Sequence, residues 1–144
     1  MQNVLIRAAT PADADAMNRI LSDVSRDGAR VDFERITSGR SCNKEDASLV
    51  AEIDGKVVAF MISYVFDGGF GLERSAWIAT LGVSPSCMGK GIGTLLAEKL
   101  MSIYRRKSVK HLFTAVRWDS VDLLSFFKTL GFYRSDFINL EKKL

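Results

Sequence analysis

Cysteine and histidine are scarce in this chain of 144 residues, which contains two cysteines and one histidine. Two cysteines are too few for a disulfide framework, and neither the Cys nor the Cys/His spacings are those of a metal site. We therefore expect free thiols and no bound metal.

Long apolar runs are also missing. No stretch approaches the roughly 20 apolar residues that span a bilayer, and the N-terminal residues, MQNVLIRAATPADADAM, lack the basic start and apolar block of a signal peptide. We expect no membrane association and a cytoplasmic location. Hydrophobic residues make up 47% of the chain, which is enough for the core of one globular domain over residues 1–144.

The net charge is only +3, but basic residues cluster between positions 105 and 111. The cluster consists of Arg105, Arg106, Lys107, Lys110 and His111. Such a cluster can bind nucleic acid or an anionic cofactor. It also closes a predicted helix, where cations interact favourably with the negative end of the helix dipole. We prefer this second interpretation and do not expect a nucleic-acid partner.

The first half of the chain alternates between helical and strand patterns. Residues 4–8 predict a strand, Thr10-Pro11 begins a helix that ends near Gly28, and residues 31–39 predict a short second helix. Two strands, 49–53 and 56–64, are joined by Asp54-Gly55, a two-residue hairpin signal. Residues 65–75 predict a connection, and 76–83 a strand buried on both faces. Gly82 in this last strand indicates a bulge or a closely approaching ligand.

Residues 83–101, VSPSCMGKGIGTLLAEKLM, predict a strand end, a glycine-rich turn and an amphipathic helix that continues to about Lys107. Gly89 and Gly91 allow left-handed or crowded conformations, and Gly93 lets the first helical turn approach a ligand. Unpaired N–H groups at a positively polarised helix start bind phosphate. From this spacing alone, an ordinary glycine-rich loop before a helix is the alternative.

Residues 111–116 predict another strand, so that strand, helix and strand form a unit with parallel strands and a right-handed crossover. Ligands of such sheets bind beyond the carboxyl ends of the strands, where the glycine turn lies. Asp119 or Ser120 caps a further helix, which Gly131 ends. Residues 132–134 and 137–141 predict two short closing strands.

Four segments, IRAATPADADAM, DGKVVAF, LGVSPSCMGKGIGTLL and FFKTLGF, together resemble the GNAT superfamily of acetyl-CoA-dependent N-acetyltransferases in order and spacing. The resemblance implies an α/β fold of three layers, with a splayed, mostly antiparallel sheet and a central parallel strand pair. Acetyl-CoA would be the co-substrate and lie in the cleft between the strands that end at Val83 and Val116. Its pantetheine arm would pair with the backbone of Leu81, Gly82 and Val83. Its pyrophosphate would bind backbone N–H groups of Met88, Gly89, Lys90, Gly91, Ile92, Gly93 and Thr94.

The chain departs from the family pattern at four positions. Met88 replaces the usual Gln or Arg, which removes a side-chain contact to phosphate but leaves the backbone donors. Phe127 stands in place of a tyrosine that protonates the departing thiolate in many members, and Ser120 in place of an asparagine; both positions would contact the cofactor. Trp77 stands where the histone-modifying branch has a glutamate, so we do not expect that activity.

The resemblance implies direct acetyl transfer from acetyl-CoA to a primary amine of a small molecule or peptide. The amine must lose a proton before it attacks, and the candidate bases are Asp119 and Glu73, followed by Asp122 and Glu52. Each of these carboxylates can instead be a solvated or helix-capping group.

The acceptor pocket would be lined by Tyr64, Phe70, Trp77 and Trp118, an aromatic set that suits an apolar or cationic molecule. The same aromatic residues can instead belong to the core. A non-catalytic acyl-CoA binding or sensing domain is the alternative function, because the tyrosine and glutamate are missing. A homodimer is possible.

Overall fold

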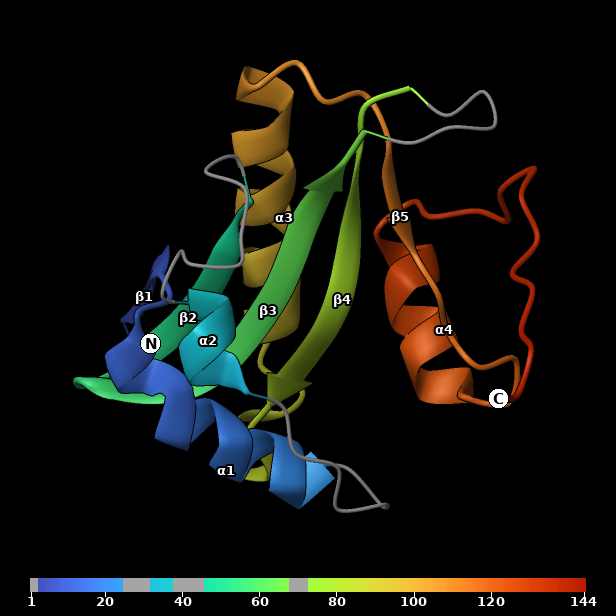
Figure 1. Cartoon of the computed structure of the whole chain (residues 1–144). Coiled ribbons are helices and arrows are strands. Elements are labelled where there is room, and N and C mark those ends of the chain that lie inside the picture. Colours follow the sequence, from blue (N-terminus) through green and yellow to red (C-terminus); the bar gives the residue numbers. More distant parts are fainter. Residues whose placement is uncertain (1–2, 25–31, 38–45, 68–72) are drawn as a thin grey trace. The chain divides into compact units, whose positions relative to one another are not determined.

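A computed structural model of the chain describes residues 3–24, 32–37, 46–67 and 73–144. Figure 1 shows the order of the elements. The strands are β1 (Val4–Ala8), β2 (Ser48–Ile53), β3 (Lys56–Phe66), β4 (Ser75–Val83) and β5 (Leu112–Thr114). The α-helices are α1 (Ala14–Val24), α2 (Phe33–Thr37), α3 (Ile92–Arg106) and α4 (Val121–Thr129), and the 3-10 turns are η1 (Pro11–Asp13) and η2 (Pro85–Cys87).

The chain divides into two compact units, Met1–Phe113 and Thr114–Leu144. The first unit contains β1 to β4 and α1 to α3, and the second contains α4. The predicted end of the first helix near Gly28, the end of the second helix and Phe70 lie outside the described residues.

The strands form one sheet in the order β1-β2-β3-β4-β5. Neighbours are antiparallel from β1 to β4, and β5 runs parallel to β4, so the predicted mixed sheet with a parallel pair is confirmed. The predicted hairpin is confirmed as well. Asp54 and Gly55 have φ values of 51° and 78°, and positive φ at both turn positions is typical of the type I′ turn that matches the twist of the strands.

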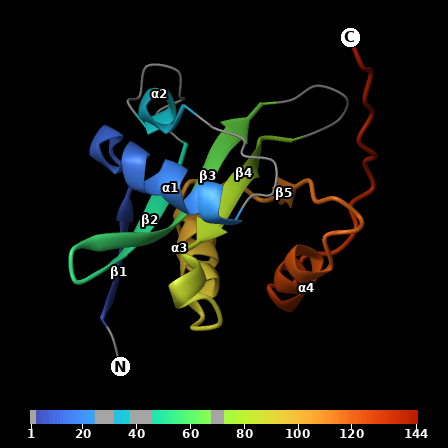
Figure 2. The same cartoon turned by 90° about the horizontal axis from the view of Figure 1, so that it is seen from below.

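Two helices cover one face of the sheet. Phe60 of β3 is fully buried there against α1 and α2, and its ring meets that of Phe33 in an edge-to-face arrangement with centroids 5.1 Å apart. Met17 and Ile20 supply the α1 side of this cluster. In the view from below, α1 and α2 lie on one side of β2 and β3, and α3 lies on the other (Figure 2). The first unit thus has three layers.

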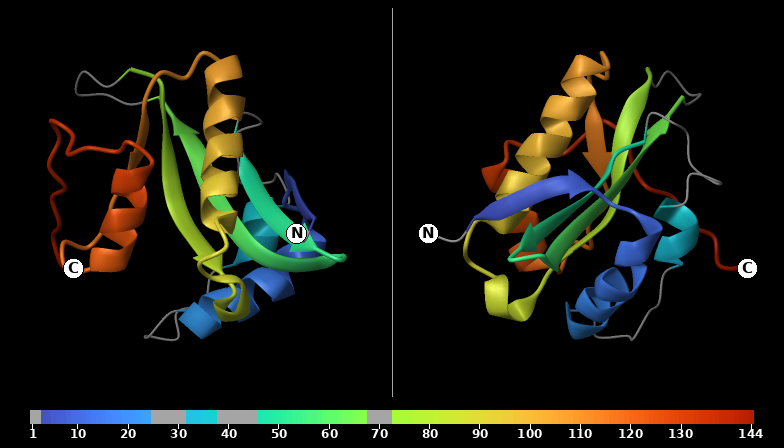
Figure 3. Two further views of the ribbon diagram at one scale, coloured as in Figure 1. Left: turned by 180° about the vertical axis from the view of Figure 1, so that it is seen from behind. Right: turned by 90° about the vertical axis from the view of Figure 1, so that its left-hand side faces the viewer.

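The second face of the sheet is covered by α3, which lies in front of the strands when the sheet is seen from behind (Figure 3, left). Leu96 and Leu100 are fully buried on this helix. Near its end, the Tyr104 hydroxyl accepts the N–H of Ala47 at 3.0 Å and lies 2.6 Å from the Ser63 hydroxyl oxygen. Burial raises the pKa of Tyr104. These bonds fasten the C-terminal end of α3 to β3 and to the segment before β2.

A bulge interrupts the pairing of β3 with β4, but not at the predicted position. Ile62 pairs with Thr80 and Ser63 with Ile78, so the extra residue is Ala79. Gly82 pairs regularly with Phe60, and the prediction of a bulge there was wrong. A Cβ at Gly82 would lie 2.9 Å from the Phe60 ring and 3.1 Å from Ile20, so glycine is needed where α1 packs against the sheet.

The second unit confirms one prediction and contradicts another. Gly131, with φ of 90°, ends α4 as a left-handed cap. The two closing strands predicted for 132–134 and 137–141 do not form. In their place, the Ser135 hydroxyl bonds with the backbone of Phe137 in a local turn, and Ile138 and Leu140 remain exposed. A short side chain that satisfies nearby backbone groups competes with strand pairing.

An ion cluster joins β1, η1 and β2. The Arg7 guanidinium donates to both carboxylate oxygens of Asp13, at 2.8 and 2.9 Å, and to Glu52 at 3.2 Å. Asp13 is buried and also accepts the N–H of Thr10 at 2.8 Å. The Arg7 guanidinium lowers the pKa of Asp13, while the two carboxylates raise the pKa of Arg7.

Replacing Asp13 by Asn is expected to lower the free energy of unfolding by about 1 to 3 kcal/mol at pH 7, because a charge-assisted bidentate contact is lost. The folded-state pKa of Asp13 lies below its unfolded value, so the ionised carboxylate stabilises the fold fully above about pH 4. That stabilisation disappears as the pH falls through the lowered pKa. Urea unfolding of the wild type and of Asp13→Asn, at pH 7 and at pH 3, measures how much stability the substitution costs at each pH. Asp15→Asn, an exposed change in the next turn, is the control, and an effect of Asp13→Asn that persists undiminished at pH 3 would contradict the assignment.

Candidate functional site

The segment between β4 and α3 exposes backbone at the start of a helix. Residues 88–91 are all exposed, and α3 begins directly after them at Ile92. Gly89 and Gly91 have φ values of 78° and 79°, so the predicted left-handed positions are confirmed, and a Cβ at either glycine would meet nothing within 4 Å. Gly93 lies inside the first turn of α3. The loop is therefore open to a ligand from the solvent.

The first turn of α3 supplies donors for an anion. Leu95 donates its N–H to the carbonyl of Gly91 at 3.1 Å. The N–H groups of Ile92, Gly93 and Thr94 precede this first helical bond and have no acceptor within the helix. Together with the helix dipole, they favour a phosphate group. The N–H of Met88, another of the predicted donors, is directed to the carbonyl of Pro85 at 3.4 Å.

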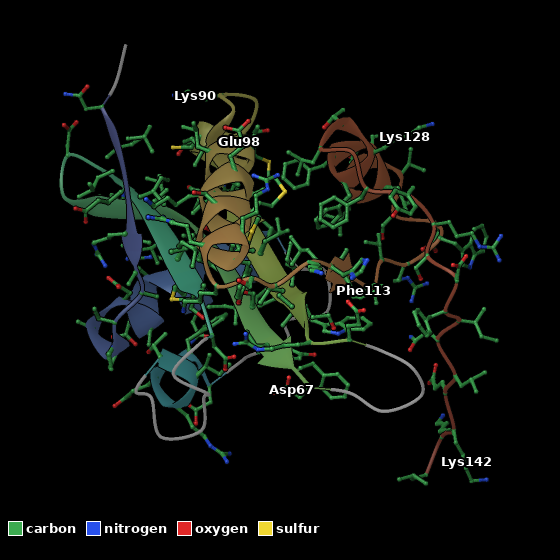
Figure 4. The ribbon with its side chains drawn as sticks, turned by 90° about the horizontal axis from the view of Figure 1, so that it is seen from above. Asp67, Lys90, Glu98, Phe113, Lys128 and Lys142 are labelled. Atoms are coloured by element: carbon green, nitrogen blue, oxygen red, sulfur yellow. The ribbon has the colours of Figure 1, made fainter. Side chains whose placement is uncertain are left out.

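Nearby, Lys90 adds a cation. Its side chain projects from the turn that leads into α3 and is exposed (Figure 4). A lysine at this place adds a mobile positive charge to the fixed backbone donors. The turn therefore combines a positive side chain with the backbone donors of α3.

The second half of β4 has a strand on one side only. Leu81, Gly82 and Val83 pair with Met61, Phe60 and Ala59 of β3. On the opposite side, β5 is only three residues long and begins beside the start of β4, where the Ala76 N–H donates to the His111 carbonyl at 3.0 Å. Within the described ranges, no strand continues along the far edge of Leu81 to Val83. An extended ligand can pair with this edge as an added strand would.

Two of the predicted pocket residues come together on β3 and β4. Tyr64 and Trp77 are directly opposite in the register, and 43% of Tyr64 is exposed. The Trp77 ring stacks on Phe113 of β5, with centroids 5.0 Å apart and an interplanar angle of 24°. Glu73 is exposed just before β4.

The remaining predicted site residues belong to the second unit. The Asp119 carboxylate makes two hydrogen bonds with the guanidinium of Arg117, at 3.0 and 3.1 Å, and Arg117 lowers the pKa of Asp119. Ser120 precedes α4 without a side-chain bond to the helix. Trp118 is 86% exposed. Phe127 is buried as a core residue, with its ring edge-to-face to Phe126 and Phe132.

Two aromatic residues near the site, His111 and Phe113, and the ion pair of Glu52 were not predicted from the sequence. His111 and Phe113 extend the stack from Trp77, with the His111 and Phe113 ring centroids 6.2 Å apart. Their alternation in a predicted strand next to β4 was the available signal. Glu52, a candidate base, is an ion-pair partner of Arg7.

Two general features of the described ranges bear on the site. No three His, Cys, Asp or Glu side chains come together there in a way that could hold a metal ion. None of the helices in those ranges has the length and apolar character that crossing a bilayer requires.

Comparison with known proteins places these features in a family. The profile of the acetyltransferase (GNAT) family matches residues 15–132. Mycothiol acetyltransferase of Amycolatopsis mediterranei is 28% identical over 109 residues, which are 74% of this chain. The chain spans only 36% of the length of that relative.

Solved structures share the fold at low sequence identity. A ribosomal-protein-alanine N-acetyltransferase from Brucella melitensis superposes with a TM-score of 0.77 at 19% identity, covering 99% of this chain and 100% of that one. An aminoglycoside N-acetyltransferase in complex with CoA gives a TM-score of 0.79 at 15% identity, covering 99% and 96%. These likenesses show the fold, and the family profile shows the relationship: the chain belongs to the acetyltransferase (GNAT) family.

Proposed function

We propose that the chain is an N-acetyltransferase that moves an acetyl group from acetyl-CoA to a primary amine of a small molecule or peptide. The observation that carries this proposal is the exposed loop of residues 88–91, which leads through two left-handed glycines into the N-terminus of α3. The family profile crosses the boundary between the two units and supports the proposal that residues 1–144 act as one domain.

The cofactor would bind mainly to backbone groups. The N–H groups from Gly89 to Thr94 suit its pyrophosphate, and the free edge of Leu81 to Val83 suits the pantetheine arm. Bound acetyl-CoA supplies a thioester carbonyl. Ala79, the extra residue of the bulge, leaves nearby backbone groups outside the regular hydrogen bonding with β3. A backbone N–H at the bulge, or one at Leu81 to Val83, would stabilise the negative charge that develops on the carbonyl oxygen.

The transfer needs a neutral amine. An alkylammonium group has a pKa near 10.4, so a base must remove its proton before the nitrogen attacks. Of the two leading candidates, Glu73 is the better one, because the contact with Arg117 lowers the pKa of Asp119 and makes that carboxylate a weaker base. The C–N bond forms as the C–S bond breaks, and the electron pair leaves with the sulfur as a thiolate. The nitrogen gives up its second proton to water, so that the product is a neutral amide.

The thiolate has no proton donor at Phe127, whose side chain lacks a hydroxyl. A thiol pKa near 8.5 makes the thiolate a tolerable leaving group. We therefore propose that water protonates it after the C–S bond has broken. Ser120 and Phe127 remain proposed cofactor contacts.

A free-thiol release assay with acetyl-CoA tests the proposal. The amine panel contains arylalkylamines, polyamines, aminoglycosides, amino acids and peptides with a free N-terminus. We expect release of coenzyme A that depends on at least one amine. If acetyl-CoA raises the melting temperature but no amine supports release, the chain is an acyl-CoA binding or sensing domain. If acetyl-CoA leaves the melting temperature unchanged, the cofactor site itself is wrong.

A further inference from the structure

Aromatic side chains gather at one end of the sheet, across β3, β4 and β5. Trp77, Phe113 and His111 form a stacked series with centroid separations of 5.0 and 6.2 Å and interplanar angles of 24° and 28°. Tyr64 lies opposite Trp77 in the register, and Phe66 opposite Ser75. We call these five residues, Tyr64, Phe66, Trp77, His111 and Phe113, the aromatic ladder. Figure 4 labels Phe113, the ladder residue on β5, and Asp67, which directly follows the last residue of β3.

The ladder shares a face of the sheet with the second half of β4. Successive residues of β3 alternate between faces, so Tyr64 points to the same side as Phe60 and Ile62. Ile62 pairs with Thr80 and Phe60 with Gly82, which places Trp77, Thr80 and Gly82 on that side as well. The ladder is therefore continuous with the stretch of β4 that the proposed reaction uses.

The helices that bury this face do not cover the ladder. The cluster beneath α1 and α2 ends at Ile62 on β3. Beyond it, Tyr64 is 43% and Phe66 45% exposed. Exposed aromatic rings next to a reaction site provide flat binding surface at a small entropy cost.

Charge around the ladder argues against acceptors with several cationic groups. The segment between β3 and β4 reads DGGFGLER and contains only two acids, Asp67 and Glu73. Asp67 pairs with Arg74 at 3.9 Å. An acceptor with several ammonium groups needs several carboxylates. Among the residues that the structure describes here, Asp67 is engaged by Arg74, and Asp46 accepts the N–H of Val65 at 2.6 Å.

We infer that the amine acceptor carries an aromatic ring, which binds on the aromatic ladder beside Trp77 while its amine is acetylated. The inference rests on the proposed acetyl transfer for its reaction and on the ladder for its substrate class. An added ring continues the existing stack, since aromatic pairs prefer offset or edge-to-face contacts with centroids about 4.5 to 7 Å apart.

Binding can be measured without turnover. The wild-type protein, with saturating coenzyme A, is titrated in a calorimeter with 2-phenylethylamine, with 2-cyclohexylethylamine and with spermidine, and the three dissociation constants are compared. We expect 2-phenylethylamine to bind about two- to tenfold more tightly than its saturated analogue. Equal or tighter binding of the saturated amine or of spermidine would overturn the inference.

Turnover of the wild-type protein separates the inference from the proposed function. We expect the kcat/KM for 2-phenylethylamine to exceed those for 2-cyclohexylethylamine and spermidine. Trp77→Leu should remove this preference and Trp77→Phe, which keeps a ring, should retain it. Tight binding of 2-phenylethylamine without thiol release from any amine of the panel would overturn acetyl transfer and leave the ladder as an aryl-amine site. Thiol release with spermidine or an aminoglycoside but not with 2-phenylethylamine would support acetyl transfer and overturn the aromatic acceptor.

Discussion

Replacing Gly91 by Asp is expected to weaken acetyl-CoA binding by about two orders of magnitude or more. Gly91 is the residue before α3, at the proposed pyrophosphate site. A carboxylate there would lie near the phosphate charges, and two like charges about 4 Å apart repel by about 4 kcal/mol near a protein surface. The carboxylate would also accept the N–H groups of the first helical turn, which the phosphate needs.

Gly91→Asn is the matched control, because Asn has the same shape without the charge. Both Asp and Asn tolerate the left-handed conformation that Gly91 adopts, with φ of 79°. Titration calorimetry with acetyl-CoA should show a modest loss of affinity for Gly91→Asn and a much larger loss for Gly91→Asp. The melting temperature of the free Asp variant should equal or exceed that of the Asn variant, since an acid at a helix N-terminus favours the helix. Equal affinities of the two variants would place the phosphates elsewhere.

Replacing Phe60 by Ala is expected to lower the free energy of unfolding by about 3 to 5 kcal/mol. Phe60 has no solvent exposure and packs against Phe33, and the position of Gly82 allows its ring to lie against β4. Its removal leaves a cavity between the sheet and the two helices on this face, which a packed core does not refill.

Phe66→Ala is the control for this change, because Phe66 is on the same strand and face but is 45% exposed. Urea unfolding followed by circular dichroism measures both variants. Phe66→Ala should lower the free energy of unfolding by well under half of the amount that Phe60→Ala does. A comparable loss in the two variants would show that the layer of α1 and α2 does not depend on Phe60.

Much of the fold was predictable because local rules govern it. Asp54-Gly55 requires a particular turn, and that turn sets the pairing of β2 with β3. The glycines at 89 and 91 precede an amphipathic pattern, so the start of α3 and the exposed loop could be read from residue order. The location of the loop and helix start that we propose as the phosphate site therefore followed from the sequence.

Other features depend on partners that are distant in the sequence. The role of Gly82 is set by Phe60 and Ile20, and no local pattern shows that their side chains occupy the place of its Cβ. The stack of Trp77 on Phe113 depends on how β4 and β5 align. The closing strands failed for a related reason, since the strand composition of residues 137–141 does not by itself supply the partner that a strand needs.

The bulge at Ala79 decides which side chain of β4 lies beside Tyr64. If Ala79 were paired in the ladder, regular alternation from Thr80 would place Ile78 rather than Trp77 opposite Tyr64. Because Ala79 is left out of the pairing, an indole occupies this position at the end of the sheet instead of a branched aliphatic group. Thr80 to Val83 have the same partners on β3 in either register, so the bulge sets the surface chemistry of the aromatic ladder without altering the stretch of β4 that we propose pairs with the cofactor.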